Sequence, residues 1–236
     1  MVYESIKEQL KKQSKQYFEH GNLLLLNIDC MDALQIAPDN LWHLSCVDPP
    51  YGIGMGGGKI GGDKCGITKD YKQFHGEDIA PPEETYFREL ERVSRNQIIW
   101  GANHFMDKVK KGSPCWVVWD KENTGNFADC ELAYTSFSTA VRVYRFKWNG
   151  MIQGDMKNKE QRIHPTQKPV KLYNWLLTNY AEKGQKILDT HLGSGSSAIA
   201  AHYFGCEFVG CELDKGYYEA SIDRIEKSTR QLEFCL

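Results

Sequence analysis

Apolar residues in this chain fall into short runs that end at glycine, proline or charged residues, and these runs alternate with longer segments of helical spacing. Strands are predicted at 23–28, 44–47, 97–101, 115–120, 186–189 and 207–211, and helices at 31–36, 81–93, 102–111, 169–180, 196–204 and after Asp214. Buried strands that alternate with helices are typical of a parallel sheet covered on both faces. We therefore expect an α/β, Rossmann-like, doubly wound fold with a mostly parallel sheet.

Three segments give weaker patterns. Residues 4–19 place apolar positions among lysines and glutamates, which predicts a surface helix. Residues 131–137 fit either a helix or a strand. Residues 140–148 alternate apolar and basic side chains, which favours an exposed or edge strand. We also expect the sheet to contain an antiparallel edge strand.

The composition is that of one globular domain spanning residues 1–236. The 236 residues are 41% hydrophobic and 25% charged, enough for a single large core. The net charge of −2 gives no overall attraction to nucleic acid, so contact with DNA would need a local basic region. Such a region runs from Arg142 to Lys171, which contains eight Lys or Arg and only two acidic residues, Asp155 and Glu160. It is either solvated surface or a phosphate-binding segment.

Other function classes receive no support. Residues 1–17 are polar, and the apolar runs are too short to span a membrane, so we expect a cytoplasmic protein without membrane contact. The eight cysteines lack the spacing of metal ligands, so we expect reduced thiols and no metal.

The most informative stretch is Asp48-Pro49-Pro50-Tyr51, directly after an apolar run. Two prolines stop a strand, because proline lacks a backbone N–H and fixes φ. The freed carbonyls of Asp48 and Pro49 would lie beside the Asp48 carboxylate and the Tyr51 ring. Acceptors next to an aromatic face suit a planar ligand with an amino group, such as a nucleobase. The alternative is a strand end followed by a plain turn.

The glycine-rich residues 52–76 follow immediately. Without apolar periodicity they predict a flexible loop, either one that orders on binding a target or a mobile surface loop without a role.

The C-terminal part has the pattern of a nucleoside site. A strand at 186–189, a glycine loop at 190–195, a helix and a second strand ending in Glu212 follow one another. Glycines let the backbone approach a ligand, and an acid at a strand end accepts hydrogen bonds from ribose. The same spacing loosely matches a dinucleotide fingerprint, so an NAD-dependent oxidoreductase is a competing hypothesis, although it leaves residues 48–51 unexplained. A structural α/β domain is a third. Asp29, at the end of another predicted strand, is a ligand or a helix N-cap.

Taken together, these motifs resemble the S-adenosylmethionine-dependent DNA amino-methyltransferases. Asp48 to Tyr51 resembles their catalytic motif, residues 189–196 resemble their methionine-binding loop, and Glu212 their ribose-binding acid. Residues 164–169 resemble the segment that contacts the methionine end of the cofactor. Asp29 is at the position where the family has the residue that contacts the cofactor's adenine. The order of the motifs is similar to the permuted β class. The resemblance thus implies S-adenosyl-L-methionine bound by Asp29, His164, Thr166, Gln167, Lys168, Asp189, His191, Gly193, Gly195, Ser196 and Glu212.

The resemblance also implies a reaction. Catalysis would involve Asp48, Pro49, Pro50 and Tyr51: Asp48 and the Pro49 carbonyl would accept the hydrogens of an exocyclic amino group, and Tyr51 would stack on the base. The target would be DNA with the base flipped out of the duplex. Adenine N6 is the preferred target, because an Asp in this motif is commoner among adenine enzymes; cytosine N4, RNA and protein amides stay open.

Two departures from the family pattern bear on cofactor and target. Thr190-His191 stands where the family usually has Pro-Phe, so an imidazole replaces the aromatic ring near the cofactor. Residues 149–163 are a minimal segment where larger members carry a target-recognition domain. We therefore expect a short or relaxed target sequence, with a homodimer as one way to enlarge the reading surface.

Overall fold

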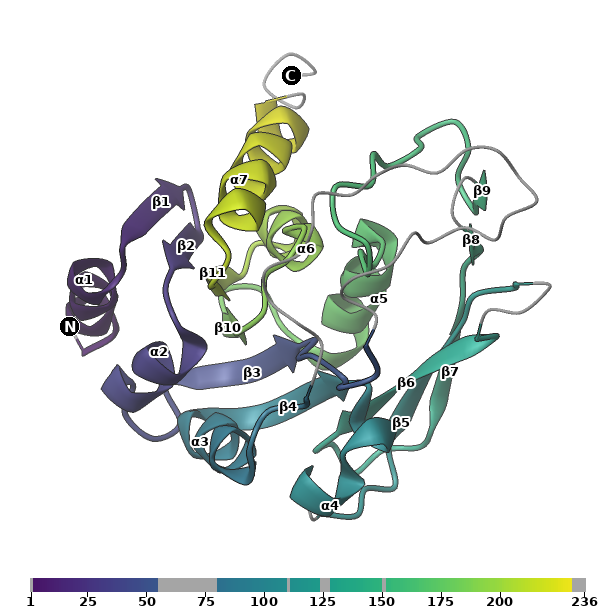
Figure 1. Ribbon diagram of the computed structural model, residues 1–236, viewed down its shortest axis with the longest axis horizontal. Helices are drawn as coiled ribbons and strands as arrows, with labels where there is room; N and C mark the ends of the chain where they lie inside the picture. Colours follow the sequence, from purple (N-terminus) through teal and green to yellow (C-terminus); the bar gives the residue numbers. More distant parts are fainter. Residues whose placement is uncertain (1, 55–79, 110, 124–127, 150–151, 231–236) are drawn as a thin grey trace.

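The computed structural model describes residues 2–54, 80–109, 111–123, 128–149 and 152–230 (Figure 1). The glycine-rich loop expected at 52–76 lies outside the described residues from 55 onward. The main sheet has nine strands in the order β1 (Gln16–His20), β2 (Leu23–Asn27), β11 (Glu207–Glu212), β10 (Lys186–Asp189), β3 (Trp42–Val47), β4 (Ser94–Trp100), β6 (Cys130–Thr135), β5 (Trp116–Asp120) and β7 (Arg142–Arg145).

Strand directions confirm the expected fold class. Strands β2, β11, β10, β3 and β4 pair in parallel, whereas β1 is an antiparallel edge strand and β6 runs antiparallel to both β4 and β5. β7 forms the other edge, parallel to β5. A separate small hairpin joins β8 (Trp148–Asn149) to β9 (Ile152–Gln153).

Helices cover both faces of the sheet (Figure 1). On one face pack α1 (Val2–Gln13), α2 (Cys30–Ile36) and α3 (Glu84–Val93); on the other pack α5 (Val170–Tyr180), α6 (Ser196–Phe204) and α7 (Lys215–Arg230). The run at 23–26 serves both cores, since Leu23 and Leu25 face one and Leu24 and Leu26 the other. Such a strand needs apolar side chains at every position, because successive residues point to opposite faces.

The predicted helix over 4–19 is wrong in its second half. The helix ends at Gln13, and residues 16–20 form β1, which pairs with β2 through a two-residue loop, Gly21-Asn22. Glycine next to asparagine is a hairpin signal, and pairing with the buried β2 overrides the weak helical spacing. The short helix predicted at 102–111 is a 3₁₀ turn, η1 (Ala102–His104), followed by α4 (Met106–Val109).

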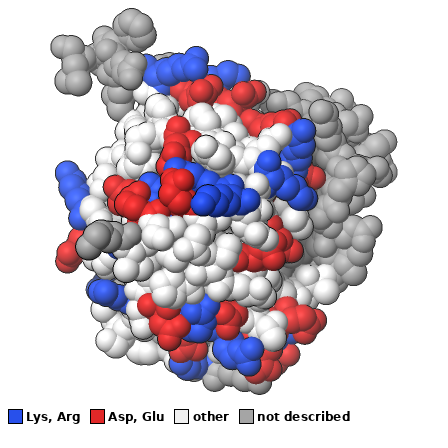
Figure 2. Space-filling view, turned by 90° about the vertical axis from the view of Figure 1, so that its left-hand side faces the viewer, with Lys and Arg blue, Asp and Glu red and all other residues white. Residues whose placement is uncertain are grey.

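The face that carries α1 has closely mixed charge. Figure 2 shows Lys and Arg interleaved with Asp and Glu on this side. Around α1, Lys7 pairs with Glu4 and Glu19, and Lys11 pairs with Glu8 and Glu19. Charges that neutralise one another at contact distance do not favour phosphate binding on this face. Among the described residues, no helix is long and apolar enough to cross a membrane.

The central strands should dominate stability. Leu188 in β10 is fully buried, so Leu188→Ala is expected to lower the free energy of unfolding by about 2–5 kcal/mol through lost burial and a cavity. Leu213, which is 59% exposed, provides the matched control, and Leu213→Ala should change it by less than about 0.5 kcal/mol. Urea unfolding measures both; equal midpoints for the two variants would contradict this description of the core.

Candidate active site

Acidic residues stand at the carboxyl ends of four neighbouring strands. Asp29 follows β2, Glu212 ends β11, Asp189 ends β10 and Asp48 follows β3. Because these strands are parallel, all four ends lie along one edge of the sheet, which is where open α/β sheets bind ligands. The sheet therefore brings the predicted catalytic motif next to the predicted cofactor loop.

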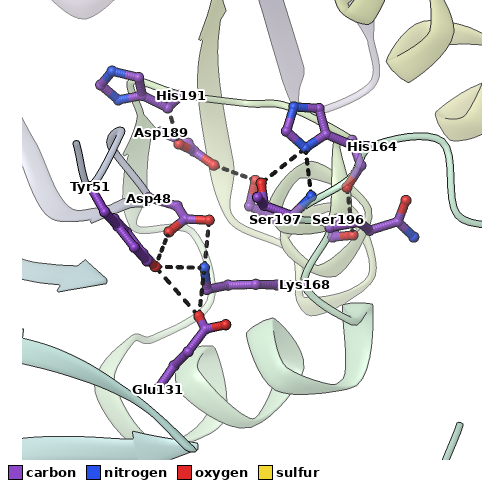
Figure 3. Close-up of polar contacts among 12 residues, drawn as sticks. Asp48, Tyr51, Glu131, His164, Lys168, Asp189, His191, Ser196 and Ser197 are labelled. Atoms are coloured by element: carbon purple, nitrogen blue, oxygen red, sulfur yellow. Dashed lines mark hydrogen bonds and ion pairs between the residues drawn. The ribbon is translucent and has the colours of Figure 1, made fainter. Parts of the chain in front are cut away.

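The Asp48 carboxylate is held by two donors (Figure 3). The Tyr51 hydroxyl donates to Oδ1 at 2.7 Å, and the Lys168 ammonium donates to Oδ2 at 2.5 Å. Lys168 Nζ also contacts Tyr51 Oη at 3.1 Å and Glu131 Oε2 at 3.0 Å. Glu131 in turn pairs with Lys121 through its other oxygen, Oε1. A chain of alternating charges thus starts at the predicted catalytic Asp48 and continues through Lys168 and Glu131 to Lys121.

Burial sets the electrostatics of this cluster. Burial raises the pKa of Asp48, with the Glu131 charge acting in the same direction and Lys168 in the opposite one. Burial lowers the pKa of Lys168, but its two carboxylate partners outweigh that and leave the pKa raised. Burial also opposes ionisation of Glu131, yet Lys168 and Lys121 lower its pKa to about 2. Lys168 and Glu131 are therefore charged at neutral pH.

Tyr51 is fixed by close packing. A Cβ atom at Gly101, whose φ is +69°, would lie 2.1 Å from the tyrosine ring, so only glycine fits there. The His104 ring lies nearly parallel to Tyr51, with centroids 5.2 Å apart. The ring consequently has little freedom to turn away from Asp48.

The cofactor loop contains two buried acids with different partners. Asp189 is 1% exposed and accepts from the His191 N–H at 3.0 Å and the Ser197 hydroxyl at 2.6 Å. Burial raises its pKa to about 7. Glu212 accepts from the backbone N–H groups of Gly193 at 2.8 Å and Asp214 at 2.9 Å. Burial raises the pKa of Glu212 as well. Each oxygen of Glu212 accepts one of these bonds and keeps a lone pair for a further donor.

His191 is held as a neutral imidazole. Its Nδ1 lies 2.9 Å from the Thr190 hydroxyl, which lies 2.6 Å from the Tyr86 hydroxyl. Burial lowers the pKa of His191 to about 4. The pair Thr190-His191, which departs from the family pattern, is thus built into a hydrogen-bonded chain anchored on α3.

Two side chains of the segment 164–169 have different environments: His164 packs against the final helix, and Gln167 bonds within its own loop. The His164 ring packs edge-on against Tyr217 with centroids 4.3 Å apart, and its Nδ1 lies 3.1 Å from the Thr166 hydroxyl. Burial, assisted by nearby cations, lowers the pKa of His164 to about 4. The Gln167 side chain instead accepts from the Ile163 N–H at 2.9 Å and donates to the Gln161 carbonyl, so it braces its own loop.

The remaining predicted site residues have structural partners. The Ser196 hydroxyl contacts Ser194 at 3.1 Å and accepts from Arg224 at 2.9 Å. Gly195 precedes α6 with a φ of +74°, and a Cβ atom there would lie 2.8 Å from the Ile225 side chain. Asp29 is exposed and accepts from the Met31 N–H at 2.8 Å, the geometry of a helix N-cap. That bond occupies one oxygen and is compatible with a ligand on the other.

Glu131 and Lys121 are the members of this cluster that the motifs do not reveal. Glu131 lies in the segment whose pattern fits both helix and strand, and its contact with Lys168 depends on the antiparallel placement of β6. Within the described ranges, no group of three or more His, Cys, Asp or Glu side chains is arranged to hold a metal ion.

Almost the whole length of the chain matches one protein family. A family model described as DNA methylase, of the N6/N4 type, matches residues 2–223. This chain belongs to that DNA methylase family. The type II methyltransferase M2.LlaDCHI of Lactococcus lactis subsp. cremoris is 23% identical, over 91% of this chain and 93% of its own length.

Solved structures support the same fold for this DNA methylase. TTHA0409 of Thermus thermophilus, complexed with S-adenosyl-L-methionine, matches with a TM-score of 0.54 and 18% identity over 87% of this chain and 95% of its own. The cytosine-N4-specific PvuII DNA methyltransferase matches with a TM-score of 0.59 and 12% identity over 89% of this chain and 91% of its own.

The raised pKa of Asp189 predicts a pH-dependent stability. An unfolded Asp ionises near pH 4 and the folded Asp189 near pH 7, so its contribution to stability is complete below about pH 4 and is lost as the pH rises through about 7. Between these pH values the free energy of unfolding should fall by a few kcal/mol, and Asp189→Asn should flatten this fall. Urea unfolding of the cofactor-free protein at several pH values measures it. The exposed Asp223 provides the control. If Asp189→Asn and Asp223→Asn retained the same slope, the prediction would be wrong.

Proposed function

We propose that this DNA methylase transfers a methyl group from S-adenosyl-L-methionine to adenine N6 of a base flipped out of DNA. The observation that carries the proposal is the adjacency of β3 and β10, because it sets the Asp48 carboxylate beside the loop that starts at Asp189. The two carboxylates are close enough for Asp48 to raise the pKa of Asp189. An acceptor for an amino group and a cofactor site are thus close neighbours.

The residues along the strand ends fit the cofactor. Glu212, with a lone pair to spare on each oxygen, suits ribose hydroxyls, and Asp29 suits the adenine end one strand further along. His191 and His164 flank the glycine loop as neutral imidazoles. When bound, the cofactor supplies an electrophilic methyl group on a positively charged sulfur.

Asp48 has the central role in the reaction. Its carboxylate and the Pro49 carbonyl accept the two amino hydrogens, which draws the lone pair of the nitrogen out of conjugation and directs it at the methyl group. Negative charge on Asp48 also stabilises the positive charge that develops on the nitrogen. Pro50 keeps the turn stiff, and catalysis needs no covalent intermediate.

Tyr51 provides the stacking surface for the base. Its ring is locked against Gly101, and the exposed His104 already lies parallel to it. A base must therefore take the other side of the ring or displace His104. Because the His104 side chain is exposed, moving it away from Tyr51 costs little burial.

Exposed cations of the basic region are suited to phosphate contacts. Lys157 and Lys159 are exposed beside β9, near the exposed apolar side chains of Ile152 and Met156. Arg142 is exposed on the edge strand β7, whereas Lys171 pairs with Asp155 at 2.6 Å. The hairpin segment 149–163 then forms the target-reading part, and a second copy of the chain would enlarge it.

Methyl transfer is tested by mass spectrometry of nucleosides from unmethylated DNA incubated with methyl-labelled S-adenosyl-L-methionine. The wild-type chain should yield labelled N6-methyladenine. Asp48→Ala should reduce turnover at least about 100-fold, because the amino group loses its charged acceptor, with cofactor binding retained within a few-fold. Asp223→Ala, which removes an exposed carboxylate on α7, should leave turnover unchanged.

The second candidate base is cytosine N4, since the family includes both reactions. Label only in N4-methylcytosine would keep the role of Asp48 and change the base. Cofactor binding without label in DNA would contradict the proposal and indicate RNA or protein as the substrate.

The small size of segment 149–163 predicts a short target. We expect a recognised sequence of fewer than about six base pairs, because a small reading surface contacts few base edges. Sequencing that maps methylated positions in a treated genome measures this directly. A recognition sequence of six or more base pairs would show that another part of the chain, or a partner copy, reads DNA.

A further inference from the structure

Glu131 reaches the active site from a strand that runs against its neighbours. The parallel strands present their last residues at the active-site edge, whereas the antiparallel β6 presents its first, and Glu131 is the second residue of β6. It belongs to none of the motifs that resemble the methyltransferase family. Its carboxylate nonetheless lies 3.0 Å from Lys168 Nζ and 3.4 Å from Tyr51 Oη, beside Asp48 (Figure 3).

Each oxygen of Asp48 already accepts one hydrogen bond before any substrate binds. Tyr51 Oη donates to Oδ1 at 2.7 Å and Lys168 Nζ donates to Oδ2 at 2.5 Å. An amino group that docks on Asp48 can use the second lone pair of an oxygen, but it competes with the Lys168 ammonium for the charge of the same carboxylate. The identity of the donor that gives way determines whether the docked state is stable.

Lys168 is the donor that can move, because a second anionic partner lies within hydrogen-bonding distance. Tyr51 is confined by Gly101, so its hydroxyl stays near Asp48. The Lys168 side chain is only 3% exposed, and a buried ammonium needs an anionic partner. Glu131 provides one within hydrogen-bonding distance, so Lys168 can release Asp48 without losing its ion pair.

Lys121 keeps Glu131 in place for this exchange. It pairs with Glu131 Oε1, the oxygen that does not face Lys168, and lies 5.1 Å from the centroid of the Trp119 ring. The four charged side chains, Asp48, Glu131, Lys121 and Lys168, carry two positive and two negative charges, which sum to zero. A shift of Lys168 between two carboxylates therefore leaves the net charge of the cluster unchanged.

We propose that Glu131 is a positioning residue that takes over the Lys168 ammonium when the amino group of the target base docks on Asp48. Glu131 does not touch the base. It acts through Lys168, and without it the ammonium keeps its hold on Asp48. The proposal deepens the proposed function and rests on it.

The first test is Glu131→Gln in the DNA methylation assay. We expect kcat to fall about 10- to 100-fold, the effect of losing a hydrogen bond between charged groups. The KM for DNA should stay within about 2-fold, because phosphate contacts dominate DNA affinity and base docking follows binding. The kcat of Glu131→Asp should lie between those of wild type and Glu131→Gln. Asp129→Asn is the control. It also removes one negative charge, but at an exposed position two residues earlier, and its kcat should equal that of wild type.

The pH profile separates this role from a general electrostatic one. Loss of the Glu131 charge lowers the pKa of Asp48, so the rise of kcat with pH should shift to lower pH in Glu131→Gln. The plateau value of kcat at alkaline pH should nevertheless remain low, because Lys168 still occupies Asp48. A plateau equal to that of wild type would overturn the proposal.

The second test removes Lys168. In Lys168→Met, assayed on its own alkaline plateau where Asp48 is ionised, no ammonium competes for Asp48, so adding Glu131→Gln should cost less than about 2-fold. An equal loss in both backgrounds would show that Glu131 supports the fold alone, and would overturn the proposal. A cooperative urea-unfolding transition and a circular dichroism spectrum like those of wild type verify folding in each variant.

Failure of the proposed function is distinguishable from failure of this inference. Absence of DNA methylation by the wild-type chain would overturn both. Methylation by wild type together with an unaffected Glu131→Gln variant would overturn the role of Glu131 alone.

Discussion

Parallel pairing of β2, β11, β10 and β3 imposes the constraint on which this molecule depends. It aligns the ends of four strands along one edge, and each end carries an acid. That alignment makes a site out of residues that are as much as 183 positions apart in the chain, from Asp29 to Glu212. It also creates a problem, since neighbouring carboxylates that are partly buried raise one another's pKa.

The chain stabilises each of these acids in a different way. Asp29 accepts from the helix that follows it, and Glu212 accepts from two backbone N–H groups. Asp189 accepts from a hydroxyl and one backbone N–H, no cation of the described residues pairs with it, and its pKa is raised to about 7. Within the part of the chain that the structure describes, Asp48 is the only one of the four acids that faces an ammonium group. The acid to which we assign the charge during methyl transfer, Asp48, is thus the one with a buried cation beside it.

The sequence predicts much of this arrangement because its signals are local. The apolar runs predict the central strands, and the proline pair and glycine loop locate the two halves of the site. What sequence reasoning misses depends on pairing between distant segments. The strand β1 forms because a buried partner is available in β2, and Glu131 joins Asp48 because β6 is inserted antiparallel between β4 and β5. Likewise, no periodic pattern reveals that the Lys168 side chain turns towards Asp48 while Gln167 turns back on its own loop.

The strand order also determines when the sheet can form during synthesis. The two strands that lie between β2 and β3, β10 and β11, come from residues 186–212, near the end of the chain. A nascent chain therefore carries one unpaired edge of the apolar strand β2 and one unpaired edge of β3 until most of the protein has left the ribosome. Long-range pairing of this kind folds slowly and exposes strand edges that associate with other chains. Translation pauses before residue 186, or binding of a chaperone to the nascent β2 hairpin, would consequently have a large effect on the yield of folded protein.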